Sequence, residues 1–115
     1  DFGDFLRNAA NTVAEDSPEV EKVAFKMDIF KAFAKGYIES AACFLTPVEK
    51  ENLPYAALLF PYMQAVRFFA DYINGDTYYK IQYPEHNLVR TRNQVALFHS
   101  ALACVPEMKA YIESL

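Results

Sequence analysis

Glycine is scarce in this sequence, with only 3 Gly among 115 residues, against an average usage of about 7%. Few glycines leave few positions for positive φ angles, which argues against a β-sandwich or barrel with many tight turns and favours helices. Tryptophan is absent, and the only two cysteines, Cys43 and Cys104, lie far apart. This pattern indicates neither a zinc site nor a disulfide framework, so we predict buried free thiols in a reducing, cytoplasmic setting.

The sequence also lacks a cluster of positive charge and a long apolar run. Its 11 Lys and Arg are scattered among 15 Asp and Glu, for a net charge of −4, so no nucleic-acid partner is expected. The longest apolar stretch, residues 53–66, contains two prolines and is shorter than the roughly 20 residues of a membrane span, so no membrane partner is expected either. Hydrophobic residues make up 53% of the chain, which is enough for one folded core.

The chain begins at Asp1 without a Met, a basic segment or an apolar leader. It contains no internal repeat and no low-complexity tract. We therefore expect residues 1–115 to form a single helical subdomain, a fragment of a longer chain.

Apolar periodicity predicts an all-α array of four to six helices. The first helix is expected over residues 4–14, capped by Asp4 and followed by an acidic loop over residues 15–19. One side of this helix is predicted to carry Phe5, Ala9, Thr12 and Val13. A second helix begins near Asp28, and its apolar face consists of Phe30, Phe33, Ala34, Tyr37, Ile38 and Ala41.

Prolines and a glycine divide the middle of the chain. Thr46-Pro47-Val48-Glu49 forms a capping box, Pro54 restarts the helix, and Pro61 is expected to kink it. Over residues 54–74, apolar side chains surround the helix axis almost completely, which predicts a central, buried helix. Gly75 is expected to end this helix as its C-cap.

Three polar residues interrupt the apolar helix. Gln64, Arg67 and Asp71 are spaced so that they fall on one stripe. Because an unpaired buried guanidinium costs several kcal/mol, Arg67 either pairs with Asp71, with Gln64 alongside, or projects into a cleft. In a cleft it would donate hydrogen bonds to the hydroxyl and carbonyl oxygens of a ligand.

A Tyr-rich irregular segment follows over residues 76–85. Its tyrosines Tyr78, Tyr79 and Tyr83 either pack beneath the loop or present phenols to a sugar in a cleft. Asn87 is then expected to cap a last long helix. The predicted apolar face of that helix consists of Leu88, Val95, Phe98, Leu102 and Val105.

The start and the end of this last helix carry further signals. Arg90 and Arg92 lie near its N-terminus, where the helix dipole disfavours cations, so a nearby acid such as Asp76 or Glu85 is expected. Pro106 is expected to interrupt the helix, with an apolar stripe continuing to the end of the chain.

Other motifs indicate little chemistry. Asp1-Phe2-Gly3 spells the magnesium motif of protein kinases, but we predict local structure at a helix start and no metal ligand. His86 and His99 have no carboxylate or cysteine at metal spacing and are predicted to be a loop capper and a helix-surface residue. Cys104-Val105-Pro106 matches the start of a sulfatase motif, which fails because Met108 stands where an arginine is required. No catalytic and no metal-binding residue is therefore predicted.

Two stretches resemble the aminoglycoside-phosphotransferase superfamily, and within it the bacterial N-acetylhexosamine 1-kinases. The first is DFGD at the start of the chain, followed by Arg7 and by ANTVAED over residues 10–16. The second is RFFADYINGDTYYKI over residues 67–81, with HNLVRTR over residues 86–92. The resemblance implies that the chain is the helical end of the C-terminal lobe of a protein-kinase-like fold.

The resemblance further implies an ATP-dependent sugar kinase in which the catalytic and magnesium-binding Asp residues precede Asp1. ATP and Mg²⁺ would then bind to the parent chain, and neither is expected to bind to these 115 residues. Arg67 and Tyr78 resemble the contacts of the family to the hydroxyls and acetamido group of the sugar, with Gln64, Asp71 and Tyr79 as supporting residues. Some relatives are labelled mucin-desulfating sulfatases, but the sequence gives no chemical support for hydrolysis of a sulfate ester.

A different class of function is also open. A free-standing helical module that docks a protein partner would have the same composition, because both it and a piece of a larger lobe expose apolar surface. The partners expected are therefore a small sugar, the N-terminal part of the chain's own parent, and a second copy bound through exposed apolar surface.

Overall fold

Helices account for 70% of the chain in the computed structural model, which describes residues 2–115. The elements follow in the order α1 (Phe2–Ala9), η1 (Val20–Lys22), α2 (Met27–Ala41), α3 (Pro47–Glu51), α4 (Leu53–Ile73), α5 (His86–Ala103) and α6 (Val105–Ser114). Over this described range the six α-helices and one 3₁₀ turn confirm the predicted all-α class, and there is no strand. Asp1, and with it the prediction that it is no metal ligand, lies outside the described residues.

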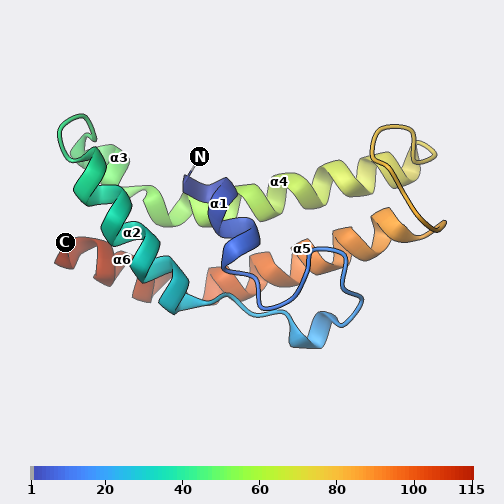
Figure 1. The fold of residues 1–115 in the computed structure, drawn as a ribbon, viewed down its shortest axis with the longest axis horizontal. Coiled ribbons are helices and arrows are strands. Elements are labelled where there is room, and N and C mark those ends of the chain that lie inside the picture. The colour runs from blue at the N-terminus through green and yellow to red at the C-terminus, as the bar shows by residue number, and fades with distance from the viewer. Residues whose placement is uncertain (1) are drawn as a thin grey trace.

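The two longest helices, α4 and α5, lie side by side and antiparallel along the long axis of the molecule (Figure 1). The loop over residues 74–85 joins them at one end, and α2, α3 and α6 gather at the other end. α1 packs across the N-terminal half of α4. The molecule is elongated, with extents of 46 × 27 × 18 Å. None of the helices in residues 2–115 has both the length and the apolar character needed to cross a membrane.

The apolar core lies toward the end of the molecule away from the loop, where α1, α2, α5 and α6 meet. Its fully covered side chains include Leu6, Phe30, Leu97, Ala101 and Met108. Phe2 joins α1 to α2, since its ring stacks on that of Phe33 with the centroids 5.4 Å apart. Burial of these side chains is the main favourable term in folding, so the helices hold one another in place through this cluster.

Several signals that depend only on neighbouring residues are confirmed. The Thr46 hydroxyl accepts a hydrogen bond from the Glu49 amide at 3.2 Å, and the Glu49 carboxylate accepts one from the Thr46 amide at 3.1 Å, which completes the capping box of α3. Pro54 lies in the first turn of α4 and Pro106 in the first turn of α6. α4 continues through Pro61 as one helix, and the kink expected at Pro61 stays a prediction. The buried residues of α2 all come from its predicted face: Phe30, Ala34, Ile38 and Ala41.

The prediction for the first helix is wrong in both bounds and face. α1 spans Phe2–Ala9, so Asp4 lies inside it instead of capping it, and Phe5 is 48% exposed. The buried residues are Phe2, Gly3, Leu6 and Arg7. The helix ends early because the chain after it pairs with a distant segment. The Lys26 amide donates to the Ala10 carbonyl at 2.8 Å, and Asn11 forms an isolated bridge with Phe25.

The prediction that α4 is central and buried is also wrong. One side packs against α1 and α5 and buries Ala57, Leu58, Pro61, Ala65 and Phe68. On the other side, more than half of the surface of four apolar residues is exposed, namely Leu59, Tyr62, Val66 and Ile73. A domain of this size has too few elements to cover every side of each apolar helix.

The last long helix differs from its prediction as well. α5 begins at His86, so Asn87 is not a cap but a buried residue of the first turn. Val95 and Leu102 of the predicted apolar face are 42% and 47% exposed. The buried residues of α5 are His86, Asn87, Asn93, Gln94, Leu97 and Ala101. The apolar pattern failed here because α5 buries hydrogen-bonded polar side chains.

The two cysteines are free, as predicted, but they are not both buried. Cys43 is exposed in the turn after α2, and Cys104 is partly buried between α5 and α6. Burial raises the pKa of the Cys104 thiol, and the nearby Glu107 carboxylate raises it further. Cys104 is therefore less reactive than an ordinary thiol.

Candidate functional site

The loop over residues 74–85 begins with a sharp turn at the end of α4. The Gly75 amide donates to the Tyr72 carbonyl at 3.3 Å, and the Asp76 amide donates to the Asp71 carbonyl at 2.8 Å, the two hydrogen bonds of a Schellman motif. Gly75 has a φ of +91°, which favours glycine and confirms its predicted role at the helix end. The turn sends the chain back along α4.

Asp71 fixes this loop to both long helices. Asp71 is 5% exposed, and its carboxylate accepts hydrogen bonds from the Tyr78 amide at 2.8 Å and from the Tyr79 amide at 3.0 Å. It also accepts one at 2.7 Å from the side-chain amide of Asn87, a fully buried residue of α5. The same amide donates to Asp76 at 3.1 Å. Asp71 therefore joins α4, the loop and α5 at one point.

The same contacts determine how Asp71 titrates. Burial raises the pKa of the Asp71 carboxyl, but the hydrogen bonds from the Tyr79 and Tyr78 amides and from Asn87 together outweigh it, so the pKa lies below its ordinary value. A carboxyl whose pKa is lowered by folding stabilises the folded state at any pH above the unfolded pKa of about 3.9. That contribution is lost as the pH falls through the folded pKa.

We expect this titration to appear in acid unfolding. Between about pH 5 and pH 2, the melting temperature of the wild-type protein should fall more steeply than that of Asp71→Asn, which has no carboxylate to protonate. Circular dichroism melts at a series of pH values measure the two slopes. Parallel curves would show that folding does not lower the pKa of Asp71.

Aromatic rings pack against one another beside Asp71. The Tyr79 ring packs on Phe68 of α4 with centroids 4.8 Å apart, and its hydroxyl donates to the side-chain oxygen of Gln64 at 3.2 Å. The Tyr78 ring meets the Tyr79 ring edge-on at 4.9 Å and is 75% exposed. Tyr79 is thus fixed at both ends, and it supports Tyr78 at the surface.

A hollow of about 250 Å³ opens between the end of α4 and the loop. The residues that line it are Arg67, Ala70, Asp71, Asn74, Thr77, Tyr78 and Tyr79. Arg67 and Tyr78 therefore line the same hollow, as two contacts to one sugar would require. A guanidinium offers hydrogen-bond donors, and a tyrosine offers a flat apolar face and a hydroxyl. The volume is slightly below the 300–1,000 Å³ typical of ligand pockets.

The prediction that Arg67 is buried is wrong. Arg67 is exposed, because it lies on the uncovered side of α4. It does not pair with Asp71, whose oxygens are bound to Tyr78, Tyr79 and Asn87. No carboxylate in residues 2–115 lies within ion-pair distance of Arg67. The guanidinium is therefore free to meet a ligand at the rim of the hollow.

Two supporting residues were not predicted as such. They are Asn87, described above, and Arg90. The Arg90 guanidinium donates to the Lys80 carbonyl at 3.2 Å and to the Asn87 side-chain oxygen at 2.9 Å. It also lies 5.6 Å from the centroid of the Phe68 ring. These contacts replace the acidic partner that was expected for Arg90. The sequence signal that could have indicated these roles is the helical spacing of the polar residues at 87, 90 and 94, which places them on one side of α5.

His86 ties two loops together beside this site. Its ring is 3% exposed, with Nδ1 accepting from the Gln82 amide at 3.2 Å and Nε2 lying 3.2 Å from the Asp16 carboxylate. Tyr83 stacks on the imidazole with centroids 4.6 Å apart. These contacts agree with the predicted loop-capping role of His86, and His99 is exposed on α5, as predicted.

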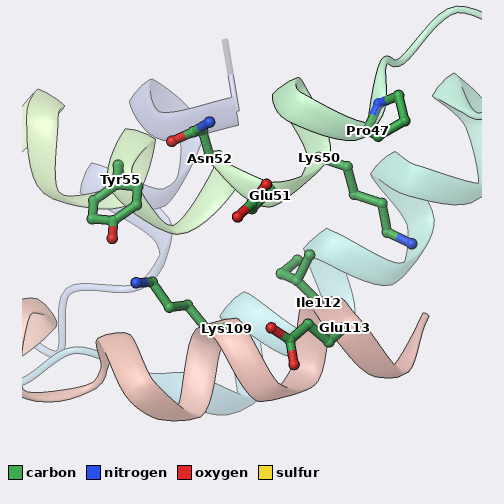
Figure 2. A pocket seen from close by; sticks show the side chains of 8 residues that line it. All are labelled: Pro47, Lys50, Glu51, Asn52, Tyr55, Lys109, Ile112 and Glu113. Carbon is green, nitrogen blue, oxygen red and sulfur yellow. The ribbon is translucent and has the colours of Figure 1, made fainter.

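A larger hollow, of about 540 Å³, lies between α6 on one side and α3 with the start of α4 on the other (Figure 2). Its lining consists of Pro47, Lys50, Glu51, Asn52, Tyr55, Lys109, Ile112 and Glu113. The Lys109 ammonium lies 4.9 Å from the centroid of the Tyr55 ring. Its charged residues are of both signs and lie at the surface, with no buried polar anchor like Asp71. We therefore take the smaller hollow at Arg67 as the candidate site.

Clusters of three or more His, Cys, Asp or Glu side chains that could hold a metal ion do not occur in the described part of the chain. No model of a known protein family matches the sequence.

Proposed function

We propose that this chain is the sugar-binding helical part of an ATP-dependent kinase that phosphorylates N-acetylhexosamine-type sugars. The observation that carries the proposal is the shared hollow, with Arg67 and Tyr78 at its rim and Asp71 anchoring the loop behind them. The resemblance of residues 67–81 and 86–92 to the N-acetylhexosamine 1-kinases supports the same assignment.

In this proposal the residues of the chain orient the sugar and carry out no chemistry. Arg67 donates hydrogen bonds to the hydroxyl and acetamido oxygens, and the Tyr78 ring covers an apolar face of the sugar. Holding the acceptor hydroxyl in a fixed position lowers the entropic part of the barrier to phosphoryl transfer. ATP, Mg²⁺ and the catalytic carboxylates would belong to another part of a longer chain, as the resemblance to the N-acetylhexosamine 1-kinases implies.

Sugar binding by the chain itself tests the proposal. Titration with N-acetylglucosamine or N-acetylgalactosamine should shift the amide resonances of Tyr78 and Tyr79 in NMR spectra. Arg67→Ala should weaken the binding by about 30-fold, equivalent to about 2 kcal/mol for a lost hydrogen bond from a charged group. In a longer chain with kinase activity, the same variant should raise the KM for sugar far more than the KM for ATP.

Arg92→Ala is the matched control, because Arg92 is exposed on α5 and does not line the hollow. It should bind the sugar as the wild type does. Equal weakening by both variants, or resonance shifts confined to residues outside the hollow, would contradict the proposal. Release of sulfate from a sugar sulfate ester, without ATP-dependent phosphorylation, would contradict it as well.

A second candidate function is a helical module that docks another protein. The observation that favours it is the row of exposed apolar side chains along α4, which the hollow at Arg67 does not use. A module of this kind would bind its partner without any response to sugar or nucleotide.

A further inference from the structure

Six exposed apolar residues form a continuous row along α4, which we call the α4 stripe. Its members are Tyr55, Leu59, Tyr62, Val66, Phe69 and Ile73, each between 44% and 65% exposed. They are separated alternately by four and three residues. This is the spacing with which one α-helix packs along another in a coiled coil, so the stripe fits a helix better than a flat surface.

The surroundings of the stripe also suit a second helix. The positions directly beside it are uncharged on both sides: Ala56, Met63 and Ala70 on one, and Leu58, Ala65 and Tyr72 on the other. Two hollows adjoin it where α5 lies against α4, and both are lined by Tyr62 and Phe98. Their volumes, about 530 Å³ and 210 Å³, leave room for side chains of a partner helix.

Along the helix axis, the members of the stripe are spaced symmetrically about the level of residue 64, which is not itself a member. Tyr62 and Val66 lie two residues from this point, Leu59 and Phe69 lie five residues from it, and Tyr55 and Ile73 lie nine residues from it. If a second α4 runs antiparallel about a twofold axis at residue 64, each apolar residue faces an apolar residue. We infer that the chain forms a twofold dimer through antiparallel pairing of its α4 stripes.

The area available agrees with this partner. Three members of the stripe are aromatic, with roughly 150–250 Å² of side-chain surface each, and three are smaller aliphatic residues. Each of the six leaves about half of its own surface exposed, so the stripe offers on the order of 500 Å² per copy. Pairing two copies would bury about 1,000 Å², the size at which specific interfaces begin. Val95 of α5, which is exposed and lines one of the adjoining hollows together with Tyr62, would add to it. The inference is independent of sugar binding, because no member of the stripe lines the hollow at Arg67.

The oligomeric state of the chain tests the inference. Sedimentation equilibrium from low to several hundred micromolar should give twice the 13.1 kDa mass of one chain. Val66→Glu places a charge beside the twofold axis and should weaken dimerisation by about 100-fold or more. Val48→Glu is the matched control, since Val48 is 66% exposed on α3, outside the stripe, and this variant should remain dimeric. Both variants should keep the helical circular dichroism of the wild type.

Cross-linking tests the antiparallel arrangement. In a background of Cys43→Ser and Cys104→Ser, chains with Tyr55→Cys should form disulfides with chains carrying Ile73→Cys, and not with themselves. A monomeric wild type at the highest concentration would overturn the inference and point to a different protein segment as the occupant of the stripe. Self-cross-linking of each variant, open-ended assembly, or equal dimerisation of Val66→Glu and Val48→Glu would overturn it too.

Discussion

Gly3→Ala should destabilise the protein, whereas Gly36→Ala should stabilise it, although both glycines lie inside α-helices. In a helix interior, alanine is normally more favourable than glycine by roughly 1 kcal/mol. The two positions differ in what surrounds them. A Cβ atom at Gly36 would have nothing within 4 Å. A Cβ atom at Gly3 would lie 2.6 Å from Phe60 Cδ2 and 2.8 Å from the carbonyl carbon of Ala56, and closer still to its oxygen.

The contact at Gly3 explains the sign of the expected effect. Ala56 contributes backbone atoms of α4, which cannot move aside as a flexible side chain can, so α1 would have to shift away from α4. Overpacking of this kind typically costs 1–3 kcal/mol, and we expect about 2–3 kcal/mol here. Gly36→Ala should gain about 0.5–1 kcal/mol, because the unfolded chain loses conformational freedom.

Urea denaturation at one fixed protein concentration measures both effects. The midpoint should fall for Gly3→Ala and rise for Gly36→Ala, with the same slope as the wild type. If Gly3→Ala were as stable as Gly36→Ala, α1 would not pack against α4 as closely as described. The expected loss of stability in Gly3→Ala would show that the glycine of the Asp1-Phe2-Gly3 motif allows α1 to approach α4 closely.

Asp71→Ala should cause the largest loss among substitutions near the candidate site. It removes the acceptor of three hydrogen bonds, from the Tyr78 and Tyr79 amides and from the buried side chain of Asn87. A buried donor left without an acceptor is more costly than a missing contact at the surface. We expect the melting temperature to fall by about 10 °C or more.

Hydrogen exchange distinguishes loss of this anchor from general unfolding. In Asp71→Ala, the Tyr78 and Tyr79 amides should exchange much faster than in the wild type, while core amides such as that of Leu97 keep their relative protection. Glu39→Ala removes an exposed carboxylate of α2 and should change the melting temperature by less than about 2 °C. Unchanged protection of the two tyrosine amides would mean that Asp71 does not hold the loop.

The elements that could be predicted from the sequence are those specified by residues close to one another. Thr46 and Glu49 cap α3 through side chains three positions apart, and Gly75 ends α4 because its φ is positive. The buried face of α2 follows from apolar residues at helical spacing. Each of these features needs only the geometry of one helical turn, so it does not depend on the rest of the fold.

The candidate site was predicted less well. Arg67 and Tyr78 do share a hollow, but Arg67 was chosen because α4 was expected to be buried on every side, and in fact Arg67 is exposed. Pairing with Asp71 was one of two alternatives for Arg67, but Asp71 instead binds the loop and Asn87. Asn87 was expected at a helix cap and instead lies at the centre of the polar network. The errors for Asp71 and Asn87 share one cause, because the residues that each of them binds lie on other elements of the fold.

By itself, then, the sequence determined the helical class, most helix ends and which residues are apolar, since these follow from local backbone preferences and from transfer of side chains out of water. The tertiary structure alone decided which apolar residues are covered. It buried the side-chain amides of Asn87, Asn93 and Gln94 in α5, and it left the α4 stripe exposed. Burial of a side chain depends on which helices and loops pack against it. The tertiary structure also assembled the hollow at Arg67, because a hydrogen bond from the loop to Asp71 exists only once the chain has folded back on α4.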